Sequence, residues 1–90
     1  MVLTLPAVIT HDQALETARG LNAQVVDQAA GVVIDASALT QFDSSALAVL
    51  LACRRAAMAA GKSFVVYGLP ATLGQLAGLY GVAELIPVTA

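Results

Sequence analysis

Few residues of this chain have side chains suited to catalysis or metal binding. It has one histidine and one cysteine, so a Cys-x-x-Cys pair is absent and His11 has no evident co-ligands for a metal. We expect His11 to be an ordinary residue at a helix start and Cys53 to be a small buried side chain. Ser44 and Ser45 lack the Gly-x-Ser-x-Gly context of a nucleophile, and phosphate-binding glycine motifs are missing. The sequence therefore predicts no catalytic residues, no metal and no cofactor.

Composition excludes further classes of function. Apolar residues make up 59% of the 90 residues and charged residues only 11%, which is typical of a folded chain rather than a disordered one. Four Lys and Arg residues and a net charge of −2 provide no basic surface for nucleic acid or for an anionic membrane. A chain of this length has room for one hydrophobic core, so we predict a single domain over residues 1–90.

The sequence gives no indication of a membrane span or a secretory signal. The longest uncharged stretch, Ser63 to Ala83, contains Pro70 and several glycines, which favours strand, turn and helix over a transmembrane helix. The segment Met1 to Thr10 lacks the positive start and long apolar run of a signal peptide. We expect a cytoplasmic protein with no direct membrane insertion.

Strands and helices alternate along the chain. Apolar residues recur at helical spacing after Thr10 and Asp12, and β-branched runs stand between the helical segments. The predicted strands are Val2 to Leu5, extended or restarted by Val8 and Ile9, then Val32 to Asp35, Phe64 to Tyr67 and Leu85 to Val88. The predicted helices are Asp12 to Ala29, with Ala14, Leu15, Ala18, Leu21 and Val25 as its apolar positions, then Asp43 to Gly61, and Pro70 to Gly81.

This alternation predicts an α/β fold, a layered domain in which helices pack on a mixed, largely parallel sheet of about four strands. The run from Val32 to Asp35 is continuously apolar until its last residue, which is typical of a central strand covered on both faces. Pro87 confines the last strand to an edge of the sheet.

The stretch from Val32 to Arg55 resembles the STAS domain family. A hydrophobic strand ends in Asp35, a short connection follows, and Asp43-Ser44-Ser45 opens an apolar helix at the place of the family's D-[ST]-[ST]-G-L segment. The resemblance covers nearly the whole chain. In particular, the chain resembles the small cytoplasmic STAS subunit of the Mla phospholipid-transport ABC system, partly through its ending, Leu79 to Pro87.

The resemblance implies a non-enzymatic subunit that binds the cytoplasmic ATPase of an Mla-like ABC transporter, and so lies at the inner membrane through its partner. A second function within the family is that of an anti-sigma-factor antagonist, in which Ser44 matches the phosphorylated position. A phosphate there would add about −1.5 to −2 charges and oppose docking. Nucleotide binding is a third alternative, which the missing phosphate loop disfavours.

A helical wheel at 100° per residue separates two faces of the helix after Asp43, independently of the family. One face has no charge and is the predicted core face: Ala46, Val49, Leu50, Cys53, Ala57 and Ala60. The other carries apolar side chains beside two arginines and predicts a partner-binding surface, although isolated exposed leucines are also common on small domains. With the helix start included, the predicted partner-binding residues are Asp43, Ser44, Leu47, Ala48, Leu51, Arg54, Arg55 and Met58.

Three questions stay open at this point. Asp43 and Ser44 are both side chains of the type that cap a helix, and the sequence does not decide between them. It also leaves open which partner is cognate and whether the isolated protein forms a homodimer.

Overall fold

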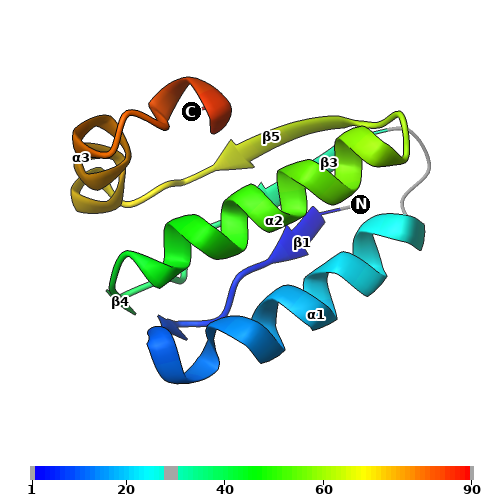
Figure 1. Ribbon diagram of the computed structural model, residues 1–90. Helices are drawn as coiled ribbons and strands as arrows, with labels where there is room; N and C mark the ends of the chain where they lie inside the picture. Colours follow the sequence, from blue (N-terminus) through cyan, green and yellow to red (C-terminus); the bar gives the residue numbers. More distant parts are fainter. Residues whose placement is uncertain (1, 28–30, 90) are drawn as a thin grey trace.

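A computed structural model describes residues 2–27 and 31–89 of the chain (Figure 1). The elements follow the predicted alternation, and the predicted end of the first helix, residues 28–29, lies outside the described residues. In chain order the elements are β1 (Val2–Thr4), β2 (Val8–Ile9), α1 (His11–Asp27), β3 (Gly31–Asp35), β4 (Gln41–Phe42), α2 (Ser45–Ala59), β5 (Ser63–Tyr67), α3 (Ala71–Leu79), a 3-10 turn (Ala83–Leu85) and β6 (Val88–Thr89).

The main sheet has four strands in the order β1-β3-β5-β6, and every pairing is parallel. β3 and β5 are the central strands and pair along their whole length, from Gly31 opposite Ser63 to Asp35 opposite Tyr67. β2 and β4 form a separate short parallel pair in which Ile9 lies opposite Phe42. This pair places the residues before α1 beside the residues before α2.

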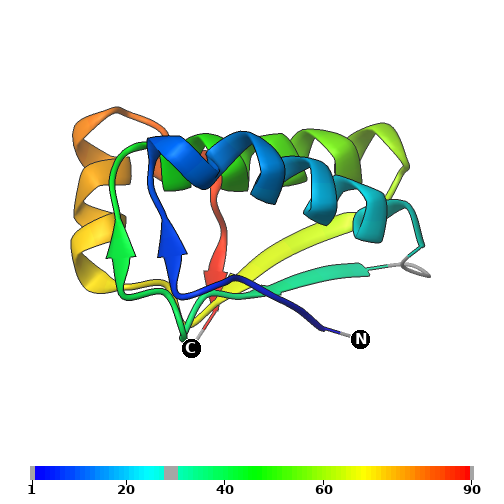
Figure 2. The ribbon, with the colours of Figure 1, turned by 90° about the horizontal axis from the view of Figure 1, so that it is seen from below.

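The helices lie on one side of the main sheet. α1 and α2 lie side by side above it, and α3 follows the carboxyl end of β5 (Figures 1 and 2). The hydrophobic core fills the space between these two helices and the sheet. Its buried residues are Leu3, Leu5, Ile9, Leu21, Val25, Val32, Ile34, Ala36, Leu39, Ala46, Leu47, Val49, Leu50, Cys53, Ala57, Val66, Leu73, Ala77 and Ile86.

The prediction that β3 is covered on both faces is wrong for the described part of the chain. Side chains alternate along β3, with Val32 and Ile34 buried under the helices and Val33 and Asp35 half-buried on the opposite face. Figure 2 shows that face of the sheet without a helix. An apolar run indicates that both faces are apolar, but it cannot show that the same chain covers both of them.

Gly61 ends α2 and directs the chain into β5. It has φ +71°, and its N–H donates to the carbonyl of Met58 at 3.0 Å, while the N–H of Lys62 donates to the carbonyl of Ala57 at 2.8 Å. This pair of bonds satisfies carbonyls that the last helical turn would leave without partners. The Nζ of Lys62 donates to the carbonyl of Val25 at 2.8 Å, so a cation also lies at the end of α1, where the helix dipole favours it.

Candidate partner-binding surface

The start of α2 is held by Asp43. Its Oδ1 accepts a hydrogen bond of 2.8 Å from the backbone N–H of Ser45. Ser44 precedes the first helical residue directly, but its side chain makes no capping hydrogen bond. Of the two residues that the sequence offered as a cap, Asp43 is therefore the one that satisfies a free N–H of the first turn. The exposed hydroxyl of Ser44 is therefore not used to cap the helix.

Asp43 also joins α2 to α1. Its Oδ2 accepts a hydrogen bond of 3.1 Å from the backbone N–H of His11, the first residue of α1. The bond from the Ser45 N–H, helped by the bond from His11 and the charge of that imidazole, holds the pKa of Asp43 below its ordinary value, against the effect of desolvation. Its carboxylate is thus ionised where two helix N-termini favour negative charge.

Five of the predicted residues form one exposed line along α2, which we call the α2 ridge: Ser44, Ala48, Leu51, Arg55 and Met58. They follow one another at steps of four and three residues, which places them above each other on a helix. Ser44, Ala48, Arg55 and Met58 are exposed, with 57% of Met58 accessible, and Leu51 is half-buried against the core. The ridge lies on the side of α2 that faces away from the sheet.

Leu47 does not lie on this surface, and the prediction that it is on the outward face of the helix is wrong. It is only 3% exposed and belongs to the core. The physical reason is its angular position, because it lies three positions before Leu50, which places it about 60° from that fully buried side chain. The core arc of α2 is wide enough to include it, as amphipathic helices commonly bury an arc of 100° or more.

Two other side chains near the ridge differ from the wheel. Arg54 is half-buried at the border of the core, because its position is about 40° from Leu50 and only its long side chain reaches outward. The prediction that Ala60 lies on the core face is wrong, because it follows the last helical residue and is exposed. Asp43 is exposed and lies at the helix start rather than on the ridge itself.

The charge of α2 is positive although the whole chain carries −2. The helix contains Arg54 and Arg55 and has no acidic residue between Ser45 and Ala59. Neither guanidinium group forms a hydrogen bond or ion pair with residues 2–27 or 31–89. Since Arg55 is also exposed, its guanidinium is available for a carboxylate of a partner.

Sequence reasoning missed a groove between α1 and α2. It has a volume of about 350 Å³ and is lined by His11, Ala14, Leu15, Ala18, Ser45, Ala48 and Val49. Leu15 is one of the apolar positions that predict the first helix, but 64% of it is exposed. The signal was present in the sequence, because Leu15 lies about 100° around the helix from Ala14, whereas Ala18 and Leu21 remain close to the Ala14 direction.

A second hollow continues between the same two helices toward their C-terminal ends. It measures about 340 Å³ and is lined by Asn22, Ala52, Arg55, Ala56 and Ala59. Ala48 belongs to both the ridge and the first groove, and Arg55 to both the ridge and the second hollow. The α2 ridge and the α1-α2 groove are therefore parts of one continuous surface, with small side chains along its floor.

Cys53 is fully buried, and burial raises the pKa of its thiol to about 11. It packs in the core, as the sequence predicted. Within the described residues, no three His, Cys, Asp or Glu side chains lie together in a way that could hold a metal ion. No helix in the described part of the chain has the length and apolar character needed to cross a membrane.

Comparison with known protein families identifies a family that covers nearly the whole chain. Residues 1–87 match the family described as "Mlab, STAS domain". No curated protein matches the chain significantly. The match includes the strand β3, the connection through β4 and the whole of α2, so it spans the elements that build the surface described above.

Proposed function

Because the chain belongs to the STAS domain family, we propose that it is a non-enzymatic subunit that binds the cytoplasmic ATPase of an Mla-like ABC phospholipid transporter. Membership of the family indicates a protein-interaction module. Our proposal adds a specific partner, a contact surface and a location at the inner membrane through that partner. The contact surface we propose is the α2 ridge together with the α1-α2 groove.

The observation that carries the proposal is the combination of accessible apolar side chains and an arginine whose guanidinium has no partner among the described residues, all on one helix face. Met58, which is exposed, and Leu51, which is half-buried, lie on either side of Arg55 along the ridge, and the hollow beside them is lined by three alanines together with Asn22 and Arg55. Small residues allow the backbone of a partner to approach closely, and burial of the exposed part of Met58 would contribute on the order of 1 kcal/mol. Arg55 would orient the partner through a carboxylate.

The proposal predicts which kind of surface the ATPase must present. Because the ridge is positive and has apolar side chains around it, the ATPase should present an apolar side chain that enters the α1-α2 groove and an acidic side chain opposite Arg55. Ser44 and Ala48 would lie at the rim of the contact near the start of α2.

Co-purification tests this assignment. We expect the wild-type protein to co-purify with the ATPase and the variant Ala48→Glu to lose this binding, because the added carboxylate and bulk lie where the ridge meets the α1-α2 groove. Ala48 is exposed and Glu is a good helix former, so the circular dichroism spectrum should not change. Leu79→Glu, at an exposed position on α3, is the matched control. Binding that survives Ala48→Glu, or that is lost equally with Leu79→Glu, would contradict the assignment.

The second candidate function is that of an anti-sigma-factor antagonist controlled by phosphorylation of Ser44. One observation favours it, namely that Ser44 is exposed and its hydroxyl is not used as a helix cap. A phosphate beside Asp43 would add negative charge to a surface whose other charge is positive, and its desolvation on docking would oppose binding.

The two functions give different results with a GHKL-type kinase partner. The antagonist function predicts that the kinase modifies the wild type but not Ser44→Ala, and that the modified protein leaves its partner. The transporter function predicts that binding to the ATPase needs no kinase and is the same for the wild type and Ser44→Ala.

A further inference from the structure

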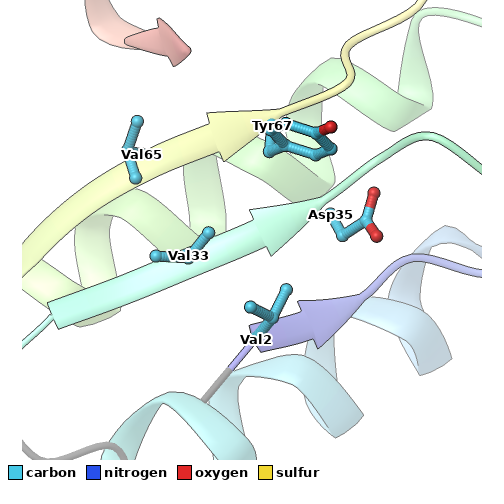
Figure 3. A pocket seen from close by; sticks show the side chains of 5 residues that line it. All are labelled: Val2, Val33, Asp35, Val65 and Tyr67. Atoms are coloured by element: carbon cyan, nitrogen blue, oxygen red, sulfur yellow. The ribbon is translucent and has the colours of Figure 1, made fainter. Parts of the chain in front are cut away.

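The face of the sheet that the helices leave open has a regular pattern of side chains (Figure 3). The strand register places the outward residues of β1, β3 and β5 in three successive rows. The middle row is entirely valine, the row toward the carboxyl ends is larger and polar, and the row toward the amino ends is small. In that order, the rows are Val2, Val33 and Val65, then Thr4, Asp35 and Tyr67, then Gly31 and Ser63.

This face is unusual for a sheet in which every pairing is parallel, because such sheets are almost always covered on both faces. Val2 is 51% exposed and Tyr67 is 45% exposed. The middle row, Asp35 and Tyr67 line an open hollow of about 360 Å³. Nothing in residues 2–27 and 31–89 covers it. The apolar outer side of β3 and β5 therefore indicates that another molecule packs there.

We propose that this molecule is a second copy of the chain, packed face to face with its strands antiparallel and the twofold axis above Val33. A dimer of this kind uses the same residues on both copies. The valine row of one copy then packs on the valine row of the other. On one side of the axis, the row of Asp35 and Tyr67 of the first copy lies opposite the row of Gly31 and Ser63 of the second. On the other side of the axis, the same two rows face each other with the copies exchanged.

The shapes of these rows are complementary to each other in this arrangement. The large side chain of Tyr67 lies opposite the small Ser63 of the second copy, and Asp35 lies opposite Gly31. The hydroxyl of Ser63 already lies over Gly31, since a Cβ at Gly31 would be only 2.9 Å from the Ser63 Oγ. Large residues opposite small ones let two faces pack without voids.

The polar groups of the rows are complementary as well. Oδ1 of Asp35 accepts hydrogen bonds from the N–H and the hydroxyl of Ser37, at 2.9 and 2.6 Å. Oδ2 of Asp35 and the hydroxyl of Ser63 have no hydrogen-bond partner among the residues described. In the antiparallel dimer the Ser63 hydroxyl of one copy donates to this free oxygen of the other, so each group gains the partner that it lacks.

Charge selects the antiparallel arrangement over the parallel one. Asp35 is the one charged residue in the three rows. With parallel strands the two Asp35 carboxylates would face each other. With antiparallel strands each lies two residues from the axis, so they are about 13 Å apart along the strands, which exceeds the Debye length of about 8 Å at physiological salt.

The contact area sets the strength of the dimer. β3 and β5 have five residues each, β1 has three and β6 has two. With a rise of about 3.3 Å per residue and a spacing of about 4.8 Å between strands, they give a flat contact of roughly 240 Å² per copy. A standard stable interface buries about 800 Å² per partner. The dimer is therefore weak and depends on concentration. The α2 ridge lies on the opposite side of the molecule and stays free in both copies.

Analytical ultracentrifugation of the full chain tests the proposal. From about 10 μM to about 1 mM, the wild type should change from monomer to dimer. Val2→Lys should raise the dissociation constant at least about tenfold, and it should fold because lysine is well tolerated on the exposed side of an edge strand. Leu15→Lys, on the helix side, should dimerise as the wild type does. A wild type that stays monomeric, or a dimer lost with Leu15→Lys but kept with Val2→Lys, would overturn the proposal.

Cross-linking with a short bis-maleimide tests the orientation of the two copies. Cys53 is buried, so engineered cysteines react selectively. Two Val65→Cys chains should cross-link to each other, because residue 65 of one copy lies opposite residue 65 of the other. Tyr67→Cys alone should not, but an equal mixture of Tyr67→Cys and Ser63→Cys chains should form links between the two variants. Links of Tyr67→Cys to itself with none in the mixture would overturn the antiparallel arrangement.

Discussion

The carboxylate of Asp43 connects the first residues of two helices, because its Oδ2 accepts the N–H of His11 at 3.1 Å while its Oδ1 accepts the N–H of Ser45. Thirty-two residues of sequence separate Asp43 from His11. The link fixes how α1 and α2 lie against each other at the end where the groove of the proposed surface begins. Asp43 thus contributes to the surface by positioning it.

Loss of this link should destabilise the fold in a pH-dependent way. The pKa of Asp43 is lowered, so its contribution to stability is present above the unfolded pKa and is lost as pH falls through the folded pKa. We expect Asp43→Ala to lower the urea midpoint at pH 7, and the difference from the wild type to shrink as the pH falls below the ordinary value of 3.8. Denaturation across this pH range measures both effects. Glu16→Gln, an exposed carboxylate on α1, should show neither, and an equal effect of the two substitutions would contradict the role of Asp43.

The burial of Leu47 gives a second prediction on stability. Leu47→Ala should reduce the free energy of unfolding by about 2 to 5 kcal/mol, as for other buried leucines. Met58→Ala on the exposed ridge should change it by no more than about 0.5 kcal/mol. Urea denaturation of the two variants makes the comparison. If Leu47→Ala were as mild as Met58→Ala, Leu47 would belong to the surface after all.

Lys62 should stabilise the end of α1 through its bond to the carbonyl of Val25. A hydrogen bond that involves a charged group contributes about 1.5 to 3 kcal/mol, and Lys62→Met should reduce the free energy of unfolding by an amount in this range. Hydrogen exchange at the amides of the last turn of α1 should also become faster. Arg19→Met, at an exposed position of the same helix, is the control and should leave both measurements unchanged. A Lys62→Met variant as stable as the control would show that the bond contributes nothing.

The groove between α1 and α2 extends the proposed interface to Leu15. Because more than half of this side chain is exposed beside the groove, its burial against the ATPase should contribute roughly 1 kcal/mol. Leu15→Ala should then weaken binding about fivefold without lowering the urea midpoint. Isothermal titration with the purified ATPase measures this effect, with Leu79→Ala as the matched control. An unchanged affinity would place α1 outside the interface.

Much of the fold could be predicted from the sequence, because its signals are local. The acidic and hydroxyl residues from Asp43 to Ser45 mark the start of α2, Gly61 marks its end, and the apolar runs before Asp35 and Tyr67 mark the two central strands. Only the structure shows which residue caps α2, since Asp43 and Ser44 have equivalent local chemistry and differ in where the backbone directs their side chains.

The errors arise where a local pattern depends on neighbouring elements. The wheel divides α2 into two halves, whereas the helix buries a wider arc that includes Leu47. The same limitation applies to Leu15, which shares the apolar spacing of the first helix but is exposed. The apolar run at Val32 to Ile34 correctly indicates two apolar faces, but only the arrangement of the helices shows that one of these faces is left open.

Site-specific photo-cross-linking tests the proposed docking surface most directly. A photoreactive side chain at Ala48 or Met58, on the α2 ridge, should cross-link to the ATPase of the transporter. The same group at Leu79 on α3, or at Val2 on the open face of the sheet, should not. Cross-links from Leu79 or Val2 with none from Ala48 and Met58 would contradict the account.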